Sequence, residues 1–346
     1  MNSTIVKNKI CFLLGLLLLS VSAFAQYLPK GMPFINNYPH EAYKAGAQNW
    51  SIINDKRNVM YFANNSGLLE FDGKYWNVYE VPNKSVVRAV LFDGNSHIYV
   101  GAFEEFGYFE PDFHGKLSYV SLSDSLQASV KSFDEIWKIH NTHEGIYFQS
   151  FKSLFVYRNN TISPIVTDRN LMFSFVVNDR LFVQDRKTGL FEYFRGKLRK
   201  IAENAAFGDD EIWSMLPLDS TTIIIGTAKN GLFLYNDISI SAWNTEISEE
   251  LKKSQLFSSE KINDNAFAFG TIQNGLLIAN KNGFIEQIIN KSKGLQNNTV
   301  LTLYKQSDKL LWLGLDNGLA TVEINSPFFL YNEGLGLNGR GYTSAL

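Results

Sequence analysis

The chain has 346 residues, of which 45% are hydrophobic and 14% aromatic, so it can bury a large core. Its formal net charge of −2 gives no electrostatic reason to expect nucleic acid or anionic lipid as a partner. It has one cysteine, Cys11, which excludes a disulfide within the chain.

Residues 1–25 predict a secretory signal peptide. Two lysines precede an apolar run at 10–21 that is too short to span a bilayer, and the small-x-small sequence Ala23-Phe24-Ala25 follows. We therefore expect cleavage before Gln26. The alternatives are an uncleaved membrane anchor and a lipoprotein, and the position of Cys11 at the start of the apolar run argues against the lipoprotein.

Removal of this segment leaves 321 residues with a net charge of −4 and no cysteine. Thiol nucleophiles and cysteine-bound metals are therefore excluded. Export without disulfides favours the periplasm of a Gram-negative bacterium. No later apolar stretch is long enough to cross a membrane, so we expect no membrane span after cleavage.

A turn residue followed by apolar residues then recurs every 36 to 46 residues. The seven anchors are Gly67, Gly107, Ser153, Gly189, Gly231, Gly275 and Gly318. A period near forty is typical of four-stranded propeller blades and also of helical repeats. In residues 211–243, four short segments rich in β-branched and aromatic residues alternate with turns, and no 3.6-residue periodicity is present.

The sequence therefore predicts an all-β fold, a seven-bladed β-propeller of four-stranded antiparallel blades over residues 26–332. The anchor should turn the chain between the second and third strands of each blade. Residues 245–253 do not follow the strand pattern. Their acidic residues come first and their lysines last, which predicts a short helix. One terminal segment, 34–38 or 328–332, must supply the outer strand of the last blade, and we expect the N-terminal one.

The units "IWSMLPLDSTTIIIGTAKNGLFLYN" and "VLTLYKQSDKLLWLGLDNGLATVEIN" resemble two-component regulator propeller repeats. The resemblance covers about residues 40–330, with blades three and four the most divergent. It implies a periplasmic ligand-sensing module of a bacterial two-component or related regulator system. Such sensors usually continue into further domains, so we expect 333–346 to be the truncated start of one.

The resemblance suggests a glycan fragment as the extracellular ligand, and a signalling partner or a second copy of the chain as a further partner. Two alternatives stay open: a propeller lyase or glycoside hydrolase, and a protein-interaction scaffold without a small-molecule ligand. We expect no enzyme activity, because Asp55, Asp93, Asp219 and Asp264 recur once per blade, which indicates turn formation.

The strongest candidate site is a column on the predicted innermost strands. Trp50, Arg88, Trp137 and Trp213 each lie 16 to 19 residues before their anchor, with Phe173, Phe257 and Leu301 at matching spacing. Tryptophan rings and an arginine at one channel mouth are suited to stacking on sugar rings and bonding their hydroxyls. Trp137 and Trp213 should face each other obliquely across that mouth; alternatively, all these rings simply pack between blades.

Two weaker candidates remain. Glu104 and Glu105 are paired acids in a loop that other units fill with neutral or basic residues, and they are suited to binding a cation or sugar hydroxyls. His140 and His143 are the only close pair among five histidines, and we interpret them as exposed turn residues. We expect no cofactor, no metal and no catalytic residue.

Overall fold

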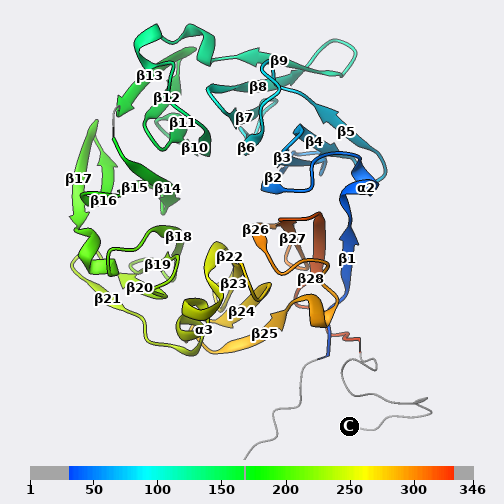
Figure 1. The fold of residues 1–346 in the computed structure, drawn as a ribbon, viewed down its shortest axis with the longest axis vertical. Helices are drawn as coiled ribbons and strands as arrows, with labels where there is room; N and C mark the ends of the chain where they lie inside the picture. The colour runs from blue at the N-terminus through cyan, green and yellow to red at the C-terminus, as the bar shows by residue number, and fades with distance from the viewer. Residues whose placement is uncertain (1–30, 167–168, 331–346) are drawn as a thin grey trace, which may run out of the picture. The chain divides into compact units, whose positions relative to one another are not determined.

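The computed structural model describes residues 31–166 and 169–330. Within these residues, the unit that begins at Met32 contains seven four-stranded antiparallel sheets, which confirms the predicted fold class. Figure 1 shows the sheets arranged as blades around a centre, with the first strand of each blade innermost. The segments predicted to be a signal peptide (1–25) and the start of a further domain (333–346) lie outside the described residues.

The seven blades follow the chain in order. Blade one comprises β2 (Asn49–Asn54), β3 (Met60–Asn64), β4 (Gly67–Phe71) and β5 (Trp76–Tyr79), and blade two comprises β6 (Val87–Phe92), β7 (Ile98–Ala102), β8 (Glu105–Pro111) and β9 (Leu117–Ser121). Blade three comprises β10 (Ile136–Thr142), β11 (Gly145–Ser150), β12 (Leu154–Arg158) and β13 (Thr161–Val166), and blade four comprises β14 (Leu171–Val177), β15 (Arg180–Asp185), β16 (Gly189–Phe194) and β17 (Lys197–Ala202).

Blade five comprises β18 (Ile212–Pro217), β19 (Ile223–Thr227), β20 (Leu232–Tyr235) and β21 (Ile240–Ala242), and blade six comprises β22 (Leu256–Asn263), β23 (Ala266–Thr271), β24 (Leu276–Asn280) and β25 (Ile285–Ile289). Blade seven comprises β26 (Val300–Lys305), β27 (Leu310–Leu315), β28 (Leu319–Glu323) and the N-terminal strand β1 (Ile35–Tyr38). The described helical elements are α2 (His40–Tyr43), α3 (Glu246–Ser254), η1 (Ser123–Ser125), η2 (Ala128–Val130), η3 (Asn204–Phe207) and η4 (Lys291–Lys293).

The ring is closed by the N-terminal segment. Strand β1 pairs antiparallel with β28, with Ile35 opposite Val322 and Tyr38 opposite Leu319, and β26 contacts β2 of the first blade. The Asn37 side chain adds a hydrogen bond from Nδ2 to the carbonyl oxygen of Gly294 at 2.8 Å. The prediction that residues 34–38 complete the last blade is therefore confirmed, and closure removes an unpaired sheet edge.

The buried apolar side chains form seven clusters, one between each pair of neighbouring blades. The cluster between blades six and seven, for example, includes Ile278 and Leu313, and the one between blades seven and one includes Phe62 and Trp312. Because both faces of each sheet are covered, second strands such as β19 are buried along their whole length. Apolar packing thus follows each blade interface around the ring.

The anchor turns agree with the prediction in most blades. Gly189 opens β16 with φ +119°, and a Cβ at this position would lie 1.9 Å from the carbonyl oxygen of Ala202, so only glycine fits. Gly107 is the exception, because it lies inside β8 and pairs with Val100. The prediction that Gly107 occupies the equivalent turn is wrong, and Phe103 with Glu104 (φ +48°) makes that turn instead.

Helix α3 lies between blades five and six, where the sequence predicted a helix. Thr245 caps its N-terminus by accepting a hydrogen bond from the backbone N–H of Ser248, and Glu246 and Glu249 occupy its first turn. Ile247 and Leu251 are buried in the cluster between these two blades. No helix in the described part of the chain is long and apolar enough to cross a membrane.

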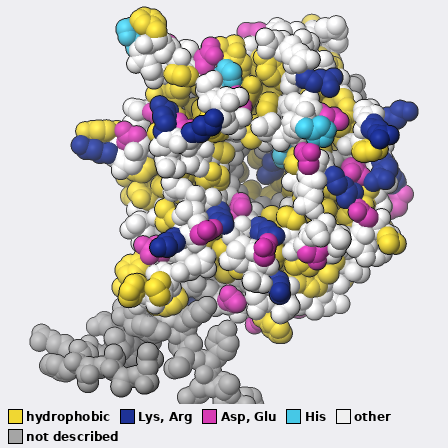
Figure 2. Space-filling model, turned by 180° about the vertical axis from the view of Figure 1, so that it is seen from behind, with side chains coloured by type: hydrophobic (Ala, Val, Ile, Leu, Met, Phe, Trp, Pro, Cys, Tyr) yellow, Lys and Arg dark blue, Asp and Glu magenta, His cyan; other side chains and the backbone are white. Residues whose placement is uncertain are grey.

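Strand direction gives the ring two distinct faces. Because the strands of a blade alternate in direction, the turns after the first and third strands lie on one face, which we call face A. The turns after the second strand and the connections between blades lie on the other, face B. Figure 2 shows the ring from behind, with a hollow at its centre and Lys, Arg, Asp and Glu side chains distributed around it.

Candidate functional site

The predicted column lies on seven β-bulges. In every blade, the pairing of the first strand with the second shifts register near the face B end of the first strand. The residues at these shifts are Trp50, Arg88, Trp137, Phe173, Trp213, Phe257 and Leu301. A bulge leaves its extra residue outside the ladder and re-aims the side chain. The sequence therefore identified a structurally equivalent position in each blade.

Arg88 lies between two tryptophans from the neighbouring blades. Its guanidinium carbon is 4.0 Å from the ring centroid of Trp50 and 4.8 Å from that of Trp137. Arg88 Nη2 donates to Glu135 Oε1 at 3.3 Å, whereas Nε and Nη1 are buried and have no hydrogen-bond partner among the described residues. The two cation–π contacts and the ion pair with Glu135 thus together stabilise this partly desolvated charge.

The stack continues into blades three and four. Trp137 stacks on Phe151 with the ring centroids 5.2 Å apart, and the Arg186 guanidinium carbon lies 4.5 Å from the Phe151 centroid. Arg186 Nε is 3.0 Å from Glu211 Oε1, and Glu211 Oε2 accepts from the indole N–H of Trp213 at 3.3 Å. Alternating rings and guanidinium groups therefore connect blades one to five on face B.

A second series of rings lies on the same wall. Phe173 contacts Trp137 at a centroid distance of 5.9 Å and Trp213 at 5.2 Å, and Trp213 contacts Phe257 at 4.5 Å. Trp137 and Trp213 are therefore neighbours on one wall with Phe173 between them. The prediction that they face each other obliquely across the channel mouth is wrong, because Phe173 of the intervening blade contacts both rings.

We call this set the aromatic mouth; its members are Trp50, Arg88, Trp137, Phe151, Phe173, Trp213 and Phe257. The three tryptophans and Phe257 are half-buried, whereas Phe173 is buried. The indole N–H of Trp50 donates to Asn65 Oδ1 at 2.8 Å. The half-buried rings combine flat apolar surface with nearby amide and carboxylate oxygens, which is the chemistry that recognises sugar rings.

Glu104 and Glu105 point to different environments. Glu105 is buried, and its Oε1 accepts hydrogen bonds from the hydroxyls of Tyr119 (2.8 Å), Ser121 (2.8 Å) and Ser123 (2.9 Å). Glu104 is exposed and accepts from Ser132 at 3.0 Å. The two acids thus form no shared carboxylate pair, and Glu105 holds the outer strand of blade two through its hydroxyl partners.

The two close histidines also have separate partners. The interpretation of His140 as an exposed turn residue is wrong, because it lies within β10 and its Nε2 is 3.0 Å from Ser174 Oγ. Burial together with the charge of Lys138 lowers the pKa of His140 to about 4, so it is neutral at pH 7. His143 is exposed as predicted, and its Nδ1 is 2.8 Å from Asp179 Oδ2. Among residues 31–166 and 169–330, no group of three or more His, Cys, Asp or Glu side chains is placed to hold a metal ion.

The recurring aspartates form turns in three of four cases. Asp55, Asp93 and Asp219 each accept hydrogen bonds from backbone N–H groups two to four residues later. Asp264 instead pairs with Lys261, and Asn263 accepts the backbone bond in its place. The turn interpretation is therefore confirmed for the first three aspartates and wrong for Asp264.

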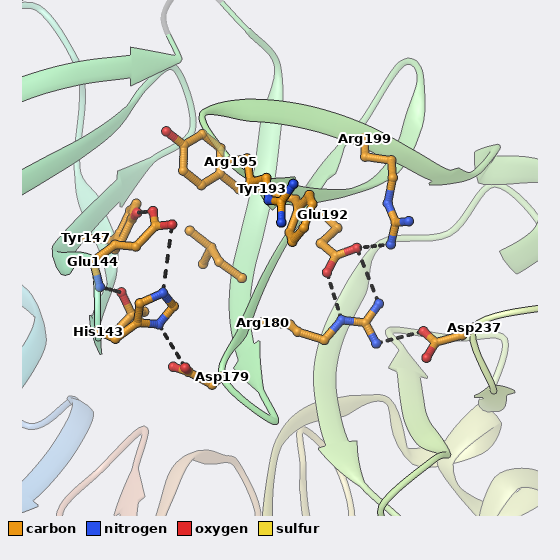
Figure 3. Close-up of a pocket in the computed structure, with 13 residues that line it drawn as sticks. His143, Glu144, Tyr147, Asp179, Arg180, Glu192, Tyr193, Arg195, Arg199 and Asp237 are labelled. Carbon is orange, nitrogen blue, oxygen red and sulfur yellow. Dashed lines mark hydrogen bonds and ion pairs between the residues drawn. The ribbon is translucent and has the colours of Figure 1, made fainter.

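The sequence pattern did not indicate a large cavity that the structure contains. It has a volume of about 770 Å³ and lies on face A, lined by residues of blades three and four and by Asp237 of blade five. Figure 3 shows His143, Glu144 and Asp179 on one side of it and Arg180, Glu192, Arg199 and Asp237 on the other. Its charged residues come from turns and strands of three blades that are far apart in the sequence, so no spacing could reveal them.

No protein-family model matches the chain, and no curated protein matches it in sequence. Solved structures do match its fold. The extracellular domain of BT4673 from B. thetaiotaomicron, described as a hybrid two-component system, has a TM-score of 0.66 at 16% identity over 85% of this chain and 40% of that chain. The corresponding domain of BT3049 from the same organism has a TM-score of 0.65 at 16% identity, over 84% of this chain and 42% of that chain.

Enzymes occur among the similar structures too. Virginiamycin B lyase from Staphylococcus aureus has a TM-score of 0.64 at 8% identity, over 84% of this chain and 98% of the lyase. At such identities the likeness shows the propeller fold alone. The present chain spans about 40% of the length of the two-component chains that it matches.

Proposed function

We propose that the chain is a ligand-sensing propeller of a bacterial extracellular signalling system and that it binds its ligand at the aromatic mouth. The observation that carries this proposal is the set of seven bulges, which direct one side chain per blade to the same end of the channel. The likeness to extracellular domains of two-component systems supports the signalling role.

The proposed ligand is a glycan fragment. The half-buried rings of Trp50, Trp137 and Trp213 offer faces and edges for stacking on sugar rings. Arg88 adds two guanidinium nitrogens without hydrogen-bond partners, which a ligand oxygen would satisfy after a small side-chain shift. Because the mouth joins several blades, a bound ligand would change how this face packs against a neighbouring domain or a second copy.

A thermal-shift screen of the chain against neutral and acidic oligosaccharides tests the proposal. A ligand that binds only the native state at 100 times its Kd adds about 2.7 kcal/mol of stability. Roughly 300 ordered residues lose about 0.6 kcal/mol of stability per degree near the midpoint, so the expected rise is about 4 °C. Substitution Arg88→Lys, which keeps the charge but loses the planar fork, should reduce this rise.

The same screen separates the alternatives. Cleaved or eliminated products after incubation with a shifting oligosaccharide would indicate a lyase or glycoside hydrolase. A complete lack of shifts across the panel would contradict glycan sensing and favour a protein-interaction scaffold. A shift that Arg88→Lys leaves unchanged would place the glycan away from the aromatic mouth.

A further inference from the structure

The cavity on face A has one side built from a fixed ion-pair network. Arg180 donates to Glu192 at 2.8 and 3.3 Å and to Asp237 at 2.7 Å, and Arg199 also donates to Glu192. Burial acts to raise the pKa of Glu192, but the hydrogen bonds from the two arginines outweigh it and lower that pKa. Glu192 is therefore ionised at neutral pH, and each member of the network has at least one charged partner.

This side of the cavity also carries an unmatched positive charge. Arg195 lines the cavity from the hairpin tip between β16 and β17, and its guanidinium carbon lies 5.0 Å from the Phe194 ring centroid. No carboxylate among the described residues pairs with it. Three arginines thus face two carboxylates, and the excess charge is located at Arg195.

The opposite side has an excess of negative charge. Glu144 is oriented by Tyr147, whose hydroxyl donates to Glu144 Oε2 at 2.7 Å. His143 Nδ1 lies 2.8 Å from Asp179 Oδ2, and His143 Nε2 lies 3.9 Å from Glu144 Oε1. Two carboxylates on this side therefore share one histidine, and they can accept further hydrogen bonds from a cation.

Apolar surface lies between the two charged sides. Tyr147 and Tyr193 meet edge to face with the centroids 5.9 Å apart, and Leu181 lines the cavity with them. Figure 3 shows Tyr193 between the acidic side and the side that carries the arginines. The volume of about 770 Å³ is within the usual range for small-molecule sites, so the cavity is large enough for a ligand with an apolar part.

We propose that this cavity binds a small zwitterion, an α-amino acid or a short peptide with free termini. The ammonium group is placed against Glu144 and Asp179, the carboxylate against Arg195, and an apolar side chain against the two tyrosines. A purely anionic ligand would meet the acidic side, and a purely cationic one would meet Arg195, so neither is complementary to the whole site. This site lies on the face opposite the aromatic mouth and does not depend on the function proposed for it.

Isothermal titration of the full chain with four probes tests the charge requirement. L-leucine and leucyl-leucine carry both charges, whereas L-leucinamide is only cationic and N-acetyl-L-leucine is only anionic at pH 7.5. At least one zwitterion should bind at least tenfold more tightly than either single-charge analogue. The proposal is overturned if neither zwitterion binds at millimolar concentration, or if an analogue with one charge binds equally well.

Two variants test whether the probe binds in this cavity. Arg195→Gln and Glu144→Gln should each weaken zwitterion binding at least tenfold. Lys74→Gln is the matched control, because Lys74 lies 4.9 Å above Tyr75 at the equivalent hairpin tip of blade one, outside this cavity. Unchanged binding in both cavity variants would locate the ligand elsewhere and refute the site. The melting temperature of each variant confirms that it is folded.

Discussion

Substitution Trp137→Ala measures how much the aromatic mouth contributes to stability. The ring of Trp137 contacts Trp50 (5.9 Å), Phe151 (5.2 Å) and Phe173 (5.9 Å), and Arg88 lies 4.8 Å from its centroid. Three aromatic pairs at about 1 kcal/mol each and one cation–π contact at about 1 kcal/mol sum to about 4 kcal/mol. Because the ring is half-buried and such terms are not additive, we expect a loss of about 3 kcal/mol.

Thermal denaturation followed by circular dichroism gives the readout. At about 0.6 kcal/mol per degree for roughly 300 ordered residues, the expected fall in melting temperature is about 5 °C. Trp137→Phe is the control, because it keeps a ring in the stack and should lower the midpoint by only about 1 to 2 °C. A midpoint for Trp137→Ala within about 1 °C of the parent would refute the view that the stack joins the blades.

Three further predictions concern the ring itself. Gly189→Ala should lower the free energy of unfolding in urea by at least about 2 kcal/mol more than Gly73→Ala. Both glycines have positive φ, but only a Cβ at Gly189 would meet a backbone oxygen, at 1.9 Å. Equal losses in the two variants would contradict this reason. Asn37→Ala should lower the free energy of unfolding by about 1 to 2 kcal/mol in urea denaturation, because the Asn37 side chain hydrogen-bonds the backbone of 294–296 where the ring closes. An unchanged free energy of unfolding would mean that ring closure does not need these bonds. Burial raises the pKa of Glu260 to about 7, so its contribution to stability is fully present below about pH 4.5 and is lost as pH rises through 7. Glu260→Gln should therefore flatten that part of the pH–stability profile, and an unchanged slope would argue against this assignment.

Much of the architecture is determined locally, and the sequence predicted that part. The forty-residue period, the turn residues and the runs of β-branched side chains each act within one blade, so they specify strands and hairpins without knowledge of the ring. The helix at α3 was predictable for the same reason, because its cap and its charge order lie within ten residues. Even the column of bulge residues was visible, since one position recurs in every unit.

One departure from the prediction concerns a glycine that has a different structural role from its counterparts in the other blades. Gly107 lies inside β8 and not in the turn, and Glu105, two residues earlier, is held by three hydroxyls of the following segment. A Cβ at Gly107 would lie 2.1 Å from the carbonyl oxygen of Val120, so the glycine serves the close approach of β9 instead. A single sequence contains no signal that distinguishes these two uses of glycine.

The composition of the sites was decided only by the tertiary structure. Arg88 is inserted between Trp50 and Trp137 because ring closure and the bulges bring three successive blades together at one end of the channel. The cavity on face A likewise joins Glu144 and Arg195, which lie on blades three and four. The strand pattern determines which side chains project from each face of a blade. Contacts between blades depend on the twist and spacing of the assembled ring, which no local pattern encodes.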